Sequence, residues 1–198
     1  MLITPAVADA DGFAPVLTSV LEASDAAAVI LRLAPGDERD LINHVKQLAA
    51  VCQQHNAALL LDGDADLVAR GGADGAHLSG IDAFSGSLGT LKPERIAGCG
   101  SLTTRHDAMS AAEQGADYVM FGEPDAQGAR PTFAGIEERV AWWAEVFEAP
   151  CIAYAAALEE IAPLVAAGAD FVALGEWAWS PDTIGKAAAA LRLPESAA

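Results

Sequence analysis

Several residues with chemically useful side chains stand directly after short apolar runs in this sequence. Arg32 follows the run 27–31, and Asp62 and Asp64 follow the run 58–61. Arginine can grip a phosphate with its planar, forked guanidinium group, and carboxylate oxygens suit a hard cation such as Mg²⁺. These residue types therefore predict a site for a phosphorylated ligand, with or without a metal ion.

A third aspartate extends the same idea. The carboxylates of Asp62, Asp64 and Asp82 could converge on Mg²⁺, with a pyrophosphate supplying further ligands. The plainer alternative is that Asp62 or Asp64 caps the helix that follows, which aspartate does well, and that Arg32 pairs with one of these aspartates. Both interpretations stay open at the level of the sequence.

Histidine and glutamate residues end other apolar runs. His77 could act as a general acid or base, or it could be a hydrogen-bonded residue of the core. Glu123 and Glu176 follow two closely similar apolar runs and could serve only as helix N-caps or as surface charge. Trp177 and Trp179 are expected to pack, although they could also wall a pocket for a flat ring.

The placement of these residues depends on a phrase, Gly-Ala-Asp, that occurs three times, at 72–74, 115–117 and 168–170. Each glycine ends a helical run rich in alanine, where a left-handed cap suits a residue without a Cβ atom. An apolar run follows that is too short for a helix and too continuous for a half-exposed strand. Such runs are typical of strands buried on both faces in parallel sheets.

Eight such strands alternate with helices along the chain. The strands are expected at 2–4 (ended by Pro5), 27–31, 58–61, 95–99 and 150–154, and one after each Gly-Ala-Asp phrase. The segment 79–90 is expected to be a loop with at most a short helix, and Thr104 with Asp107 resembles a capping box. The alternation predicts parallel strands with right-handed crossovers, closed into a single-domain TIM (β/α)8 barrel over residues 1–198.

A barrel of this kind places its active site at the carboxyl ends of the strands. We therefore expect Arg32, Asp62, Asp82 and Ser101 to line one cavity at that end. We also expect Val119, Met120, Val172 and Ala173 to lie in buried strands.

Composition limits the partners. A formal net charge of −17 argues against nucleic acid as the main partner. No apolar stretch approaches the roughly 20 residues of a membrane helix, and the first residues do not resemble a signal peptide. Cys52, Cys99 and Cys151 show no metal-ligand spacing, so free thiols in the cytoplasm are expected.

Taken together, these residues resemble the thiamine phosphate synthase/TenI family of barrels over nearly the whole chain. The matching segments are Asp62-Gly63-Asp64, then Ala73-Asp74-Gly75-Ala76-His77-Leu78-Ser79-Gly80-Ile81-Asp82, Cys99-Gly100-Ser101-Leu102-Thr103-Thr104 and the run 115–122, together with Arg32. The resemblance implies Mg²⁺ held by aspartates on the pyrophosphate of a pyrimidine, and a thiazole phosphate near the last strands.

The resemblance also assigns roles to residues. Those expected in catalysis are Arg32 and Ser101, and those expected in substrate binding are Arg32, Asp62, His77, Thr104, Gly122 and Gly175. For Mg²⁺ the resemblance implies Asp82, and the carboxylates of Asp62 and Asp64 are the other candidates. The expected partner is a small phosphorylated heterocycle, with no nucleic acid and no membrane, and a homodimer is possible.

The chain departs from the family at several charged positions. Gly63 stands at one metal aspartate, the loop 123–128 has no counterpart of the family's lysine, and the phosphate-binding Gly-Gly-Ile is replaced by residues 155–157, all alanine. Three hypotheses follow: an enzyme that joins or rearranges a phosphorylated heterocycle, a non-catalytic barrel that binds a small ligand or a protein, and a sugar-phosphate isomerase or epimerase on the same fold. Weak or absent synthase activity is expected.

Overall fold

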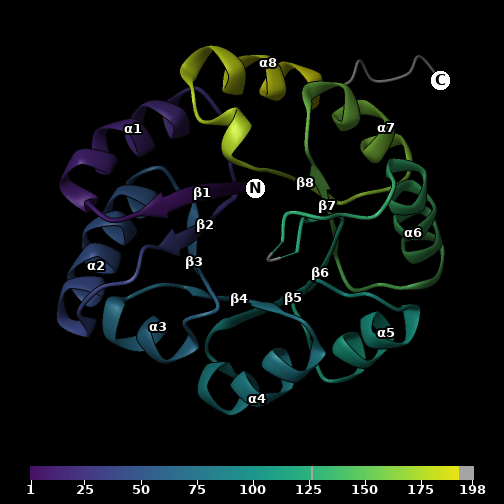
Figure 1. Ribbon diagram of the computed structural model, residues 1–198, viewed down its shortest axis with the longest axis horizontal. Coiled ribbons are helices and arrows are strands. Elements are labelled where there is room, and N and C mark those ends of the chain that lie inside the picture. Colours follow the sequence, from purple (N-terminus) through teal and green to yellow (C-terminus); the bar gives the residue numbers. More distant parts are fainter. Residues whose placement is uncertain (126, 192–198) are drawn as a thin grey trace.

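The computed structural model describes residues 1–125 and 127–191, which fold into one closed parallel barrel surrounded by helices (Figure 1). The eight strands are β1 (Leu2–Val7), β2 (Ala28–Leu33), β3 (Ala58–Asp62), β4 (Gly75–Ser79), β5 (Ile96–Gly100), β6 (Tyr118–Phe121), β7 (Cys151–Ala155) and β8 (Phe171–Leu174). The α-helices are α1 (Ala10–Glu22), α2 (Glu38–Gln54), α3 (Ala65–Gly71), α4 (Ile81–Leu91), α5 (Arg105–Glu113), α6 (Phe133–Val146), α7 (Ile161–Ala166) and α8 (Pro181–Leu191). Two short 3₁₀ helices, η1 (Leu158–Glu160) and η2 (Glu176–Ala178), follow β7 and β8.

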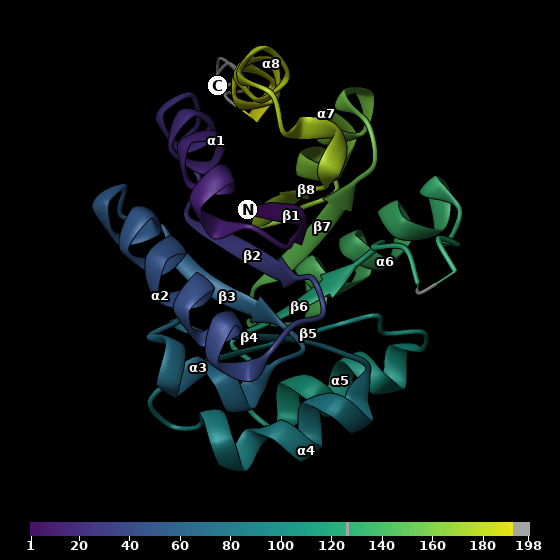
Figure 2. The same cartoon turned by 60° about the vertical axis from the view of Figure 1, so that its left-hand side comes forward.

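Each strand pairs in parallel with the next, and β8 closes the ring by pairing Leu174 with Leu2 of β1. The helices form an outer ring in the view down the barrel (Figure 1) and still enclose the strands when the molecule is turned (Figure 2). The predicted single-domain (β/α)8 barrel is therefore confirmed.

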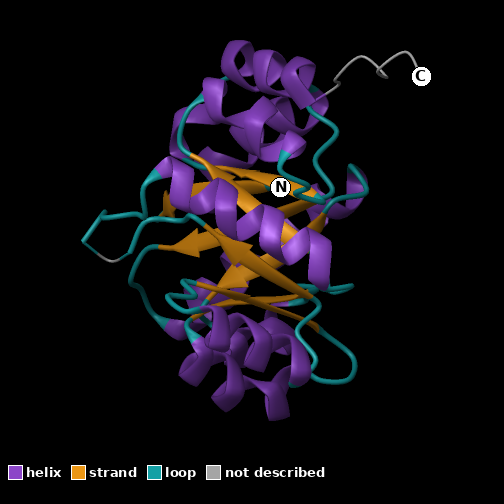
Figure 3. Cartoon of the chain, turned by 90° about the vertical axis from the view of Figure 1, so that its right-hand side faces the viewer, coloured by secondary structure: helices purple, strands orange, loops and turns teal. Residues whose placement is uncertain are grey.

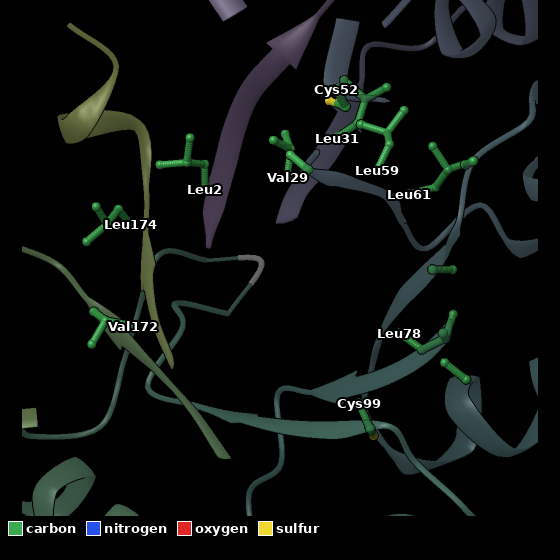
Figure 4. Close-up of a cluster of buried hydrophobic side chains, with 14 of the residues drawn as sticks. Leu2, Val29, Leu31, Cys52, Leu59, Leu61, Leu78, Cys99, Val172 and Leu174 are labelled. Atoms are coloured by element: carbon green, nitrogen blue, oxygen red, sulfur yellow. The ribbon is translucent and has the colours of Figure 1, made fainter. Parts of the chain in front are cut away.

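Alternation along the strands divides the apolar residues into two cores. One fills the space between the strands and the helices, and Figure 4 shows part of it, including Leu31, Leu59 and Leu61 of the strands and Cys52 of α2. The other fills the inside of the barrel and consists of Ile3, Ile30, Leu60, Tyr118, Met120, Ile152 and Ala173. Strand residues with neighbours on both faces have to be apolar throughout, which is why their sequence runs are continuous.

The three Gly-Ala-Asp phrases have the left-handed glycine that the sequence predicts, and their aspartates also link neighbouring strands. Gly72, Gly115 and Gly168 all have positive φ angles, of 74°, 92° and 99°. The aspartate that follows accepts a hydrogen bond from a backbone N–H at the start of the preceding strand: Asp74 from Leu59, Asp117 from Ala97 and Asp170 from Cys151, at 2.7–2.8 Å. Each phrase thus turns the chain and ties the new strand to its neighbour.

Most element boundaries agree with the sequence patterns, and the capping box of Thr104 and Asp107 is present at the start of α5. Val119, Met120, Val172 and Ala173 are buried as predicted. The first strand is longer than predicted, because β1 continues through Pro5 with a shift in register between Ile3 and Ala6. Proline is tolerated where the ladder is already interrupted.

The prediction of a loop with at most a short helix over residues 79–90 was wrong. Helix α4 runs for 11 residues there, and its buried residues Phe84 and Leu91 share a face with Ile81 and Leu88, which are partly buried. The glycines and serines of this segment obscured a spacing of three and four residues that is helical.

The three cysteines are buried free thiols, as predicted. Among the residues that the structure describes, no helix is both long enough and apolar enough to cross a bilayer.

Candidate functional site at the carboxyl ends of the strands

The inward-facing positions change from apolar to polar at the carboxyl end of the barrel. On β2, Ile30 belongs to the inner core and Arg32 follows two residues later; on β3, Leu60 is followed in the same way by Asp62. Successive inward positions on a strand lie two residues apart. The polar layer therefore lies directly above the apolar filling, at the end of the barrel toward which the strand arrows point (Figure 3).

Arg32 forms an ion pair and also faces open space. Its Nε donates a hydrogen bond of 3.0 Å to Asp62, and its Nη1 lies 3.9 Å from a carboxylate oxygen of Glu176. Its backbone N–H is held by the hydroxyl of Thr4 at 2.9 Å. Beside it lies a cavity of about 550 Å³ lined by Arg32, Asp62, Ser79, Ser101, Pro124, Asp125 and Gln127.

This cavity tests the expected grouping. Arg32, Asp62 and Ser101, from three different strands or strand ends, line it together, whereas Asp82 is absent from its lining. The pairing of Arg32 with an aspartate, which the sequence offered as an alternative to ligand binding, is present, but the pair is open to the cavity. Arg32 and Asp62 therefore border the cavity as a pair.

A buried polar cluster of His77, Tyr118 and Glu123 lies next to the site, and His77 and Glu123 line a small cavity of about 30 Å³ that shares Arg32, Asp62 and Ser101 with the larger one. His77 Nδ1 lies 2.9 Å from the Tyr118 hydroxyl, and His77 Nε2 lies 3.7 Å from Oε1 of Glu123. The His77 and Glu123 side chains are only 5% and 7% exposed. When the Tyr118 hydroxyl donates its hydrogen bond to Nδ1, the imidazole of that tautomer carries its own N–H at Nε2, toward the Glu123 carboxylate.

Two glycines of β5 make room for this cluster. A Cβ atom at Gly98 would lie 1.9 Å from the Tyr118 ring, and one at Gly100 would lie 2.0 Å from Glu123 and 2.5 Å from His77. Only glycine permits such close approach, so β5 is shaped around these three side chains. Its weakly apolar sequence has this steric cause.

Glu123 reaches the cluster by bending back over the end of β5. Its Oε1 accepts a hydrogen bond from the backbone N–H of Ser101, a residue in the left-handed region with φ of 51°. The sequence suggested only an N-cap or surface charge for Glu123. The burial of Glu123 was not predictable. It depends on Gly100 and Ser101, which come to lie beside Glu123 only when β5 and β6 pair in the barrel.

The electrostatics of the cluster keep Tyr118 protonated. Burial raises the pKa of the Tyr118 hydroxyl well above its ordinary value, and the Glu123 carboxylate raises it further. A phenol in this setting is a hydrogen-bond donor and not a source of charge. The contact between the Tyr118 hydroxyl and His77 Nδ1 fixes the orientation of the imidazole ring.

The three aspartates proposed for Mg²⁺ are not gathered into one group. Within residues 1–125 and 127–191, no three His, Cys, Asp or Glu side chains are placed to hold a metal ion. Asp62 is bound by Arg32, and Asp82 lies exposed in the first turn of α4. Asp64 stands before α3 without a capping hydrogen bond, and burial, with the nearby Asp62 carboxylate, raises its pKa. This donor set does not fit a preformed magnesium site.

Three other residues implied by the resemblance have structural roles. Thr104 is the exposed N-cap of α5, and its hydroxyl accepts the Asp107 N–H. Gly122, with φ of 93°, gives its carbonyl oxygen to Arg130 Nε at 3.1 Å. At Gly175, a Cβ atom would lie 2.2 Å from the Tyr154 hydroxyl, so this glycine accommodates that ring.

A second cavity, of about 270 Å³, lies between the ends of β5 and β6 and the start of α6. Its lining is shared with the first cavity at Ser101 and Asp125, and it adds two arginines, Arg130 and Arg139. Arg139 is committed to the carbonyl oxygens of Leu102 and Thr103. Arg130 was not predictable from the sequence, because it lies in the β6–α6 loop with no motif around it.

A closed (β/α)8 barrel with charged side chains gathered at the carboxyl ends of its strands belongs to the class of barrels that act on or bind small molecules at that face. Residues 1–176 match the sequence profile of the thiamine monophosphate synthase family, and the chain belongs to that family.

Relatives and solved structures agree with this assignment. The chain is 38% identical to a thiamine-phosphate synthase of Rhodospirillum centenum, over 90% of this chain and 88% of that protein. It is 33% identical to one of Erythrobacter litoralis, over 86% and 84% of the two chains. The structure is similar to that of thiamine phosphate pyrophosphorylase from Pyrococcus furiosus, with a TM-score of 0.75 and 20% identity over 96% of this chain and 93% of that one. Likeness at that level of identity shows the shared fold.

Proposed function

We propose that this chain binds a small phosphorylated heterocycle of the kind used in thiamine assembly, at the carboxyl face of the barrel, and that it joins the family's two substrates slowly or not at all. Arg32 is the cationic contact for the ligand. The open cavity beside the Arg32–Asp62 pair carries the proposal, because a partly exposed arginine at the edge of a cavity suits an anionic group.

Slow turnover is expected because groups that would hold a departing pyrophosphate are already bound within the chain. Asp62 accepts a hydrogen bond from Nε of Arg32, and the Ser101 N–H is donated to Glu123. Gly63 carries no carboxylate where the resemblance implies one for Mg²⁺. A pyrophosphate leaving group needs positive charge and hydrogen-bond donors in the transition state, and an enzyme without one such donor is slower by about 10²- to 10³-fold.

A second candidate function is full thiamine phosphate synthesis. The relative of Rhodospirillum centenum, named as a synthase and similar over 90% of this chain, favours it. Arg32, Asp82 and Ser101 would then carry the reaction with residues that compensate for Gly63, and Mg²⁺ would arrive with the pyrophosphate. The three buried free thiols suit the cytoplasm under either candidate.

Turnover by the purified protein separates the two candidates. The pyrimidine pyrophosphate and the thiazole phosphate are supplied with Mg²⁺, and product formation is followed together with calorimetric binding of each substrate. We expect binding of the pyrimidine ligand with turnover far below 1 per second. A rate of roughly 1 per second or more, ordinary for an enzyme, would establish the second candidate instead.

A further inference from the structure

A carboxylate of the chain itself occupies a set of anion-binding donors at the end of β7. Glu160 is the last residue of η1, which follows Ala156 and Ala157 after the end of β7. Both of its carboxylate oxygens lie 3.0 Å from Nη1 of Arg130, and Oε2 accepts the backbone N–H of Ala156 at 2.7 Å. A guanidinium and a backbone amide that converge on two oxygens form a cradle for an anion.

The cradle is rigid because Arg130 is fixed on its other side. Nε donates to the carbonyl oxygen of Gly122 and Nη2 to that of Tyr154, at 3.1 and 3.2 Å, and the guanidinium lies 5.6 Å from the centre of the Tyr154 ring. The side chains of Arg130 and Glu160 are 20% and 19% exposed. The donors are therefore held in place by the ends of β6 and β7 and do not depend on Glu160 for their position.

An external anion would have to displace a tethered one. A group attached to the same chain over a few residues competes at an effective concentration of about 1 mM or more, and its negative charge repels a phosphate that approaches while it is bound. Glu160 thus excludes phosphate from this end of the site. The β7 loop, with Ala155, Ala156 and Ala157, offers no alternative glycine-built cradle.

We propose that Glu160 is a built-in anion that selects against a phosphate at the end of β7, beside the second cavity, which Arg130 lines. Arg130 and the Ala156 amide hold the Glu160 carboxylate, and the part of the ligand that lies here is uncharged. This statement about ligand class rests on the proposed function, whereas the occupied cradle does not. A ligand whose only anionic group lies at Arg32 fits the site. A second substrate with a phosphate placed at the end of β7 does not fit.

The test is titration of inorganic phosphate into the wild-type protein and into Glu160→Gln and Glu160→Ala variants, followed by calorimetry. We expect both variants to bind phosphate at least tenfold more tightly than the wild type. Glu160→Gln keeps the shape of the side chain and guards against a variant that fails to fold. Glu159→Ala is the matched control, since Glu159 is an exposed neighbour whose loss changes the net charge equally.

Two further variants show which arginine is responsible for the tighter binding of phosphate. Adding Arg130→Ala to Glu160→Ala should abolish it, and adding Arg32→Ala should leave it in place. Equal phosphate binding by wild type and both Glu160 variants, or an equal gain in Glu159→Ala, would overturn the proposal.

The ligand class is tested separately. If the wild type binds the thiazole alcohol at least tenfold more tightly than the thiazole phosphate, and Glu160→Gln reverses that preference, the uncharged-ligand statement holds. Tighter binding of the phosphate by the wild type would overturn it. If neither thiazole compound binds but the Glu160 variants still bind phosphate more tightly than the wild type, the proposed heterocyclic ligand and the statement about its class are wrong. The role of Glu160 in the cradle would still hold.

Discussion

The two ends of this barrel are built on opposite plans. At the amino end, one joint is repeated three times: a glycine with positive φ, an alanine, and an aspartate that accepts the N–H of the preceding strand. At the carboxyl end each charged residue has its own partner, and Arg32, Glu123 and Glu160 share no pattern. The repeated joint serves the pairing of neighbouring strands, whereas the proposed ligand would account for the irregular end.

The comparison predicts that Asp74→Ala has the largest effect on stability and little effect on the site. The N–H of Leu59, in buried β3, would lose its side-chain acceptor. Leaving a buried donor unsatisfied costs about 1–3 kcal/mol. Urea unfolding should show this loss, while affinity for the pyrimidine pyrophosphate stays within about twofold of wild type. Asp74→Asn, which keeps an acceptor oxygen, is the control, and a drop in affinity in either variant would mean that the two ends are coupled.

The glycines of the joints should differ in a predictable order. A Cβ atom at Gly168 would lie 2.7 Å from that of Ala144, whereas nothing lies within 4 Å of one at Gly115. Both residues have positive φ, so alanine at either position is strained by about 1 kcal/mol, and Gly168→Ala adds a clash. Thermal unfolding should rank wild type above Gly115→Ala and Gly115→Ala above Gly168→Ala. The reverse ranking of the two variants would contradict this packing.

The three cysteines are predicted to be unreactive, and to cause no change of stability with pH, near neutral pH. Burial, with neighbouring carboxylates, raises the pKa values of the Cys52, Cys99 and Cys151 thiols from 9.0 to about 12. Because the fold favours the neutral form, the stability that this provides is fully present below pH 9 and is lost as the pH rises toward 12. A thiol reagent at pH 8 should label none of them in the native protein and all three in denaturant. Rapid native labelling would show that a helix opens readily.

The fold was largely predictable because its signals are local. Helix caps, continuous apolar runs and the Gly-Ala-Asp joints each act within a few residues, and they gave the order of the strands and the closed barrel. The failures were also local in cause. Glycine and serine concealed the helical face of Phe84 and Leu91 in α4, and Pro5 suggested the end of a strand that continues past an irregular register.

The site was predictable only in part, because pairing between distant side chains leaves no mark on a single sequence. Arg32, Asp62 and Ser101 could be assigned to one edge from the positions at which their strands end. The turn of Glu123 toward His77, and the ion pair of Glu160 with Arg130, arise when loops fold back over the barrel. The sequence does not show that the charge of Arg130 is neutralised by Glu160, because the two residues are 30 positions apart.

The central claim, that Arg32 serves a ligand at an otherwise structural barrel, is tested most directly by an Arg32→Ala variant. Affinity for the pyrimidine pyrophosphate and the free energy of unfolding are measured together, with Arg70→Ala as the control, since Arg70 pairs with Glu38 on the surface. We expect Arg32→Ala to weaken binding at least tenfold, or about 1.4 kcal/mol, and to change stability by less than about 1 kcal/mol. We expect Arg70→Ala to leave binding unchanged. Unaltered binding with a loss of several kcal/mol in stability for Arg32→Ala would show that the Arg32–Asp62 pair only holds the barrel together.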